Sequence, residues 1–419
     1  MRTMVSIRPY LIAAALVYLV GTPFALDGER LDLDDRVRQG VPGRFVKLSA
    51  GHTRYDLLGP QPSQVVVLVH GFTSPSYVWG EIPGRLRDAG YRTLVYDLYG
   101  RGFSDRPDVD YDLDLYDRQL EELLAKLELS ERVHLVGLSM GGVIASEFAL
   151  RHGDRVASLT LIDPAGFGVD VPVQARLLAL PLVGEYVLRA FGDGVLMSGN
   201  ERGVHDQSLV PDLQARFAPQ LAYRGYKRAI LSSMRHMPLS DFRERYRELG
   251  HGALPVQIFW GRQDRVTPFE GAEVAATLLP KAHVHPVEEA GHLPHYEKPD
   301  AVAPRLLAFL AANPAPAQQG VALQGMCGTT GAHVHTAQGD AHVAVHSDAA
   351  AGDGKASETG EGAETKRGAQ RGAASAERRA ARPPQQEKDC RECDPRKRDR
   401  MPTAEERARR RAPSRPPAE

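Results

Sequence analysis

The sequence predicts an α/β protein with a mostly parallel central sheet, helices on both faces of that sheet and an inserted helical cap. Several short apolar segments lack polar–apolar alternation, so we expect strands that are covered on both faces. Helical patterns lie between these segments, and strands that alternate with helices form parallel sheets with right-handed crossovers. One long segment, residues 169–250, has helical patterns but no convincing strand.

The predicted elements begin with a hairpin and continue as alternating strands and helices. Residues 44–48 and 55–58 flank a turn and indicate an edge hairpin. The further strands are predicted at residues 65–69, 93–96, 133–136, 159–162, 256–260 and 283–287, with helices at 116–129 and 143–151. Because ligands of such sheets bind beyond the carboxyl ends of the strands, we expect the functional residues at that edge.

Residues 169–250 are predicted to form the cap, because they are inserted between two strands of the sheet. Their helical patterns, 173–180 and 211–237, should break or kink at Pro181 and Pro219. The apolar residues of the cap include Leu177, Leu178, Leu180, Leu182, Val183 and Leu188. These residues could face the sheet, a substrate or a membrane. Ordinary packing of the cap is the favoured interpretation, and direct contact with an acyl chain is the alternative.

The N-terminal part differs from the centre in composition. Residues 1–26 place Arg2 and Arg8 before an apolar run over 10–20, a pattern typical of an export signal or a short membrane anchor. A helix packed on the domain is the third possibility. We therefore expect an exported or membrane-anchored protein that meets a membrane surface through this segment, with polar residues 27–43 as a spacer.

The catalytic domain is predicted at residues 44–168 and 251–312, and residues 313–419 are predicted to be a disordered tail. The tail is rich in Ala, Gly, Gln, Arg and Pro, a composition that cannot bury enough apolar surface to fold. It also contains all three cysteines of the chain. Neither a metal site nor a cofactor site is predicted, and the net charge of −1 argues against a nucleic-acid partner.

The most informative motif is the Gly-x-Ser-x-Gly turn around Ser139. An apolar strand leads into Gly137, and a helical pattern begins directly after Gly141. The two glycines let the strand and the helix approach closely, which leaves the Ser139 hydroxyl at the strand tip. The N–H groups at the start of that helix favour an oxyanion at the same place. Because the motif also occurs by chance, the presence of suitable partner residues must decide whether Ser139 is a nucleophile.

A serine nucleophile needs a histidine base, and the histidine needs a carboxylate that orients it. Asp264 follows one predicted strand and His292 follows the next, in a Gly-His-x-Pro setting. The order Ser139, Asp264, His292 is the order expected for this architecture. His295 is the alternative base, and Asp163, which also ends a strand, is the alternative acid.

The oxyanion hole is predicted from two backbone donors. One is the N–H of Met140, directly after the nucleophile. The other is the N–H of Phe72, in the His-Gly-Phe loop that follows the strand over residues 65–69.

Together these motifs resemble the α/β-hydrolase fold family, and within it the serine esterases and lipases with a helical cap. The resemblance covers residues 44–312 and includes the loop from Tyr96 to Ser104, where it implies that Asp97 and Ser104 shape the loop and perform no chemistry. Haloalkane dehalogenases and epoxide hydrolases of the family carry aspartate in place of Ser139. Cofactor-free haloperoxidases and carbon–carbon bond hydrolases share the serine triad, so the motifs do not exclude these two activities.

The sequence therefore predicts a monomeric serine hydrolase that cleaves a small-molecule carboxylic ester, with a lipid-like or medium-chain acyl group, through an acyl-enzyme. Carbon–carbon bond hydrolysis by the same triad is the alternative. A non-catalytic binding protein of the same fold is the alternative from another class.

Overall fold

The computed structural model describes residues 8–168 and 173–315. Its centre is an eight-stranded sheet with the order β1-β2-β4-β3-β5-β6-β7-β8. All neighbouring strands from β4 to β8 in this order are parallel. β1 and β2 form the predicted antiparallel edge hairpin. The strands are β1 (Arg44–Leu48), β2 (Gly51–Leu58), β3 (Val65–Val69), β4 (Arg92–Tyr96), β5 (Val133–Leu138), β6 (Val156–Ile162), β7 (Val256–Gly261) and β8 (His283–Val287).

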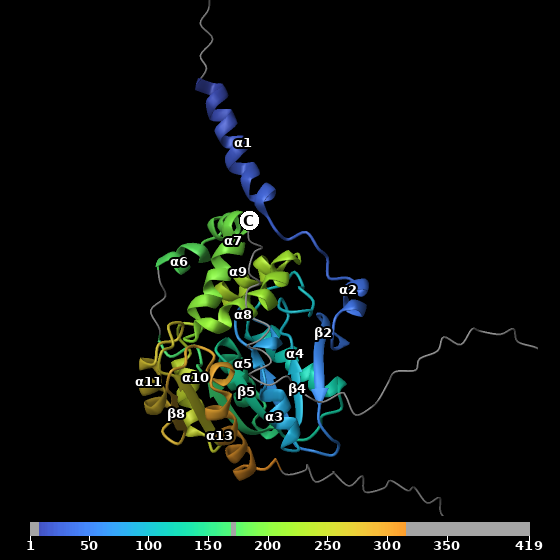
Figure 1. Cartoon of the computed structure of the whole chain (residues 1–419), viewed down its shortest axis with the longest axis vertical. Coiled ribbons are helices and arrows are strands. Elements are labelled where there is room, and N and C mark those ends of the chain that lie inside the picture. Colours follow the sequence, from blue (N-terminus) through green and yellow to red (C-terminus); the bar gives the residue numbers. More distant parts are fainter. Residues whose placement is uncertain (1–7, 169–172, 316–419) are drawn as a thin grey trace, which may run out of the picture. The chain divides into compact units, whose positions relative to one another are not determined.

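Helices cover both faces of the sheet, as the apolar strands predict (Figure 1). The core helices are α3 (Ile82–Asp88), α4 (Leu113–Lys126), α5 (Met140–Arg151), α11 (Glu270–Leu278), α12 (Pro294–Glu297) and α13 (Pro299–Ala312), and α2 (Asp35–Gly40) precedes β1. α4 begins three residues before the predicted start, because the Asp112 side chain caps it by accepting a hydrogen bond from the N–H of Leu115.

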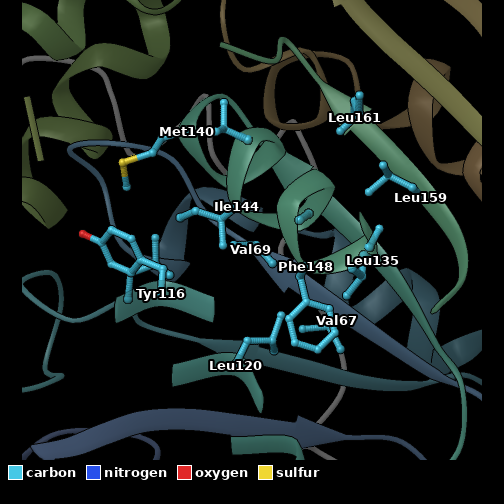
Figure 2. Packing of buried hydrophobic residues seen from close by; sticks show 14 of the residues in the cluster. Val67, Val69, Tyr116, Leu120, Leu135, Met140, Ile144, Phe148, Leu159 and Leu161 are labelled. Atoms are coloured by element: carbon cyan, nitrogen blue, oxygen red, sulfur yellow. The ribbon is translucent and has the colours of Figure 1, made fainter. Parts of the chain in front are cut away.

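Two apolar layers fix the sheet. On one face, β3 and β5 residues such as Val67 and Leu135 meet side chains of α4 and α5, among them Leu120 and Phe148 (Figure 2). On the other face, α3 and α13 cover the alternate residues of the same strands. Because these side chains are fully buried, truncating one such as Leu135 to alanine should cost about 2–5 kcal/mol of unfolding free energy. The layers hold the carboxyl edge of the sheet rigid.

Between β6 and β7, the described residues of the insertion are helical: α6 (Val173–Ala179), α7 (Val183–Arg202), α8 (Val210–Phe217), α9 (Tyr226–His236) and α10 (Arg243–His251). The predicted proline breaks are present, since Pro181 separates α6 from α7 and Pro219 lies in a 3-10 turn between α8 and α9. Ordinary cap packing is confirmed for Leu188, which is buried in a cluster of cap residues. It is wrong for Leu177, Leu180 and Leu182, which are exposed.

The apolar N-terminal segment forms α1 (Arg8–Leu26), which packs against α7 of the insertion. Where the two helices meet, the Arg189 guanidinium lies over the Phe24 ring. None of the helices within residues 8–168 and 173–315 has the length and apolar character needed to cross a bilayer. The predicted disordered tail falls outside the described residues from position 316 onward, as do its cysteines.

Candidate active site

Ser139 lies in a strained turn at the carboxyl end of β5. Its φ of 53° and ψ of −118° are unfavourable for a residue with a side chain, and α5 begins at the next residue. The Ser139 N–H donates to the carbonyl of Ile162 at the end of β6, 2.9 Å away, which ties the turn to the sheet. This strand–turn–helix geometry is that of a nucleophile elbow.

Two glycines make the turn possible. A Cβ atom on Gly141 would lie 2.0 Å from the carbonyl oxygen of Val69, and one on Gly137 would lie 2.4 Å from the carbonyl oxygen of Gly141. Both distances are far below van der Waals contact, so no other residue fits either position. The backbone therefore has the close approach of strand and helix that was inferred from the sequence.

His292 and Asp264 meet at the carboxyl ends of β8 and β7. The Nδ1 atom of His292 lies 2.7 Å from Oδ2 of Asp264, and both side chains are buried. Burial opposes ionisation of Asp264, but the His292 charge and several hydrogen bonds outweigh it and lower the pKa of this carboxyl group. An ionised Asp264 accepts a hydrogen bond from Nδ1–H of His292, which leaves Nε2 of His292 free to act as a base.

Thr267 completes the environment of Asp264, a role that was not predicted from the sequence. Its hydroxyl donates to Oδ2 of Asp264 at 2.7 Å, and its N–H donates to Oδ1 at 3.0 Å. The N–H of Val266 adds a third bond at 2.7 Å. These donors fix the carboxylate plane against His292. The signal was local: the turn that follows β7 places Thr267 three residues after the acid.

The alternative base, His295, lies elsewhere. It is fully buried beside Trp79, and its Nε2 atom donates to the carbonyl of Val78 at 3.0 Å. Burial lowers the pKa of His295 to about 3. This histidine is therefore a neutral core residue, and within the described residues no hydrogen bond joins it to Ser139 or Asp264.

The alternative acid, Asp163, does lie near the pair. One ligand atom from each of Asp163, Asp264 and His292 lies within 4.8 Å of the other two. Asp163 is fully buried, and burial together with the neighbouring Asp264 charge raises its pKa well above the usual value. Its Oδ1 atom accepts the N–H of Gly261 at 2.8 Å. The two acids thus differ in charge: Asp264 is the carboxylate, and Asp163 favours the neutral form.

These three residues also form the one group, within the described part of the chain, whose geometry could hold a metal ion. Asp264 already accepts bonds from His292 and Thr267, and Asp163 favours the protonated form. A neutral carboxyl group and an occupied carboxylate are poor donors for a cation. We therefore interpret the group as an acid–base pair with a buried neighbour.

The predicted oxyanion donors flank Ser139. Met140 is the first residue of α5, so its N–H has no partner within the helix. Phe72 lies in the loop after β3, where a Cβ atom on Gly71 would be 3.3 Å from Cβ of Ser139. The two loops are therefore in contact beside the nucleophile, as an oxyanion hole requires.

Arg101 supports this loop, a role that the sequence did not reveal. It is fully buried, and its Nε donates to the carbonyl of Phe72 at 2.8 Å. Its other nitrogens donate to the hydroxyls of Tyr116, at 3.1 Å, and Ser233 of α9, at 3.0 Å. The Arg101 guanidinium thus joins the Phe72 loop to Tyr116 of the core and to Ser233 of the cap. Asp97 plays a similar structural part, since it accepts the N–H groups of Ser76 and Phe103.

Ser139 and His292 open onto one cavity of about 440 Å³, which also contains Gly71 and Phe72. Core and cap share its wall. Its apolar lining consists of Val78, Leu138, Ala175, Leu213, Val266 and Leu293. Among the described residues, the charged ones of the lining are Arg202 and Arg265, and none of its residues is a carboxylate. The cap is attached to the catalytic loop directly, because the N–H of His292 donates to the carbonyl of Gly203 at 2.7 Å.

A model of the alpha/beta hydrolase family matches residues 66–305, which span the elbow, the insertion and the His292 loop. The chain belongs to the alpha/beta hydrolase family. Within this family, the chain is 29% identical to 2-hydroxy-6-oxononadienedioate/2-hydroxy-6-oxononatrienedioate hydrolase of Paraburkholderia xenovorans, over 66% of this chain and 97% of the relative.

Two further members of the alpha/beta hydrolase family are named as lipase and esterase. The chain is 26% identical to Lipase 1 of Psychrobacter immobilis, over 60% of this chain and 78% of the lipase. The structure of a thermophilic esterase from Thermogutta terrifontis matches with a TM-score of 0.55 and 25% identity, over 64% of this chain and 99% of the esterase. The family and its hydrolase character are thus established, whereas the relatives differ in the bond that they cleave.

Proposed function

We propose that this alpha/beta hydrolase is a serine esterase that cleaves carboxylic esters with lipid-like or medium-length acyl chains. The observation that carries the proposal is the convergence of the strained Ser139 and the Asp264–His292 pair on one cavity. Each group comes from a different strand end, and together they supply nucleophile, base and orienting acid.

In the proposed reaction, Oγ of Ser139 attacks the acyl carbonyl while Nε2 of His292 takes the hydroxyl proton. The N–H groups of Phe72 and Met140 hold the tetrahedral oxyanion. His292 then donates the proton to the leaving alkoxide, which departs as the alcohol and leaves an ester on Ser139. A water molecule, deprotonated by His292, attacks this acyl-enzyme and releases the carboxylic acid. Asp264 stabilises the imidazolium in both halves.

The lipid-like acyl preference rests on the cavity. Its lining is mostly apolar, and its volume of about 440 Å³ lies in the range of small-molecule sites. The resemblance to a lipase and an esterase supports the same class of substrate. Each methylene group that enters an apolar cavity contributes about 0.8 kcal/mol.

A series of p-nitrophenyl esters from acetyl to dodecanoyl tests this preference. We expect kcat/KM to rise through the medium chain lengths and then to level off when the cavity is filled. A strict preference for the acetyl ester would contradict the lipid-like substrate class but would leave ester hydrolysis in place.

Carbon–carbon bond hydrolysis is the second candidate, favoured by the likeness to the Paraburkholderia hydrolase. It predicts rapid turnover of a vinylogous diketone and little activity on simple esters. Steady-state rates on the two substrate types, measured with the same enzyme preparation, separate the candidates.

A further inference from the structure

The exposed apolar side chains of this protein are concentrated in one part of it. Within the described residues, the large ones lie in residues 8–26 and 173–202, apart from Leu31, Val109 and Val266. The set comprises Tyr10, Leu11, Ile12, Val17, Tyr18, Leu19, Val20, Phe24 and Leu26 of α1, and Val173, Leu177, Leu180, Leu182, Val183, Phe191 and Val195 of the cap. We call this set the apolar surface. A soluble protein rarely exposes so much apolar area without a partner.

The two segments form a connected structure. α1 packs against α7, and α7 packs against α6. At the junction Asp27, directly after α1, pairs with Lys227 of α9 at 3.0 Å, and the same ammonium group binds Asp193 of α7 at 2.8 Å. The Lys227 side chain is almost fully buried there, so the end of α1 is attached to the cap by a buried ion-pair network.

The charges around the apolar surface favour an anionic partner. α1 and α6 contain no acidic residue, and each carries an exposed arginine, Arg8 and Arg176. On α7, Glu185 is paired with Arg235 and Asp193 with Lys227, which leaves Glu201 as the one acidic residue of this helix without an ion pair among the described residues. Unpaired cations beside exposed leucine, valine and tyrosine are the combination that binds an anionic lipid surface.

The same cap helices line the catalytic cavity. Ala175 of α6 and Arg202 of α7 belong to its wall together with Ser139. A surface bound to α6 and α7 therefore lies against helices that line the cavity of Ser139.

From these observations we propose that α1, α6 and α7 form one docking surface for a lipid bilayer with anionic headgroups. Docking delivers a lipid ester to the Ser139 cavity, so the inference deepens the proposed esterase function and rests on it for the substrate. The partner is the bilayer itself, and a second copy of the chain is an outcome that the experiment can reveal.

Flotation of the full-length protein with lipid vesicles tests the proposal. The vesicles contain phosphatidylcholine alone or with phosphatidylglycerol, and two variants, Leu177→Asn/Leu182→Asn and Ile12→Asn/Val20→Asn, reduce the apolar surface. The matched control is Leu31→Asn/Val109→Asn, because those side chains are 50% and 46% exposed, comparable with 51% for Leu177. All variants keep the arginine-rich residues 396–411, so differences between them arise from the substituted positions.

We expect the wild type and the control to bind anionic vesicles alike, more tightly than neutral ones, and less tightly in high salt. Each of the two surface variants should bind about tenfold or more weakly. Absence of wild-type binding, or equal binding by all variants, would overturn the proposal. So would a dimer in light scattering that the surface variants abolish without any vesicle binding.

A soluble p-nitrophenyl ester, assayed with the same samples, separates this inference from the proposed function. If the wild type binds vesicles but hydrolyses no ester, the esterase proposal fails and the docking surface stands. If it hydrolyses the soluble ester but binds no vesicle, the docking surface is wrong and the esterase proposal stands.

Discussion

The carboxyl edge of the sheet and the apolar surface of α1, α6 and α7 differ in almost every physical respect. At the sheet edge, Ser139, Asp264 and His292 are buried, and each is fixed by backbone hydrogen bonds or by a neighbouring side chain. On the apolar surface, side chains such as Leu182, which is 83% exposed, have no covering element among the described residues. The contrast shows that core packing positions the candidate catalytic residues, whereas the apolar side chains of this surface are positioned by no such packing.

The largest expected effect is on kcat/KM, and it distinguishes the roles of the two carboxyl groups at the sheet edge, Asp264 and Asp163. Asp264→Asn should lower kcat/KM on a soluble ester by about 10³–10⁴-fold, because the N–H groups of Val266 and Thr267 hold the amide oxygen and leave its NH2 group facing Nδ1 of His292, where it donates and imposes the wrong tautomer. Asp163→Asn should stay within about tenfold of the wild type, since Asp163 already favours its neutral form. Steady-state kinetics on both variants decides the matter. A reversed order would make Asp163 the orienting acid.

Arg101 links the two regions, so its loss should couple them. Arg101→Met removes the bond to the carbonyl of Phe72 and the bond to Ser233 of α9. We expect kcat to fall about tenfold to a hundredfold with a smaller change in KM, because a displaced oxyanion donor acts on the transition state.

Arg106→Met is the matched control for Arg101, since Arg106 also contacts the cap, through Gln220, but does not bind the Phe72 carbonyl. Equal losses of kcat in the two variants would show that Arg101 acts on overall stability alone. Thermal unfolding of both proteins provides the reference for that comparison.

Features of the two regions could be predicted from the sequence where their signals lie within a few neighbouring residues. Contacts between residues distant in the sequence could not. The elbow, Asp264 and His292 carry local signals, because glycines and turns at strand ends are visible within a few residues. Arg101 and Ser233 are far apart in sequence, and nothing local marks their contact. The exposure of Leu182 was equally hidden, since an apolar cap residue has the same pattern whether it faces the sheet or solvent.

A moderate effect concerns stability rather than catalysis. The folded pKa of Asp163 is raised, so the folded protein binds this proton more tightly than the unfolded chain does. Stability is therefore lost as the pH rises from the unfolded pKa, about 4, through the folded value. Asp163→Asn keeps an oxygen for the N–H of Gly261 and removes this loss. We expect its Tm to exceed that of the wild type by a few degrees at pH 8 and by less at pH 5.

Calorimetry at both pH values measures the difference. A variant that is destabilised equally at pH 5 and pH 8 would show that proton binding by Asp163 does not contribute to the stability. Asp163→Ala, which cannot accept the Gly261 N–H, should be less stable than Asp163→Asn at either pH.

The smallest expected effect lies at the boundary between the two regions, in the cavity wall. Arg202 and Arg265 line the cavity and no carboxylate of the described part of the chain does, so an ester with a terminal carboxylate should be favoured over its neutral analogue by a few fold. Arg202→Gln/Arg265→Gln should reduce this ratio of kcat/KM values, whereas Arg118→Gln, an exposed arginine on α4, should not. An unchanged ratio in the double variant would remove the two arginines from substrate selection.

Labelling with a fluorophosphonate probe tests the central claim most directly, because the probe forms a covalent bond only with an activated serine. The wild type should gain one adduct, which peptide mass spectrometry places on Ser139, and should lose its ester hydrolysis at the same rate. Ser139→Ala should neither react nor hydrolyse, although its fold is kept as judged by circular dichroism. A wild type that does not react, or a Ser139→Ala variant that reacts equally well, would contradict the assignment of Ser139 as the nucleophile.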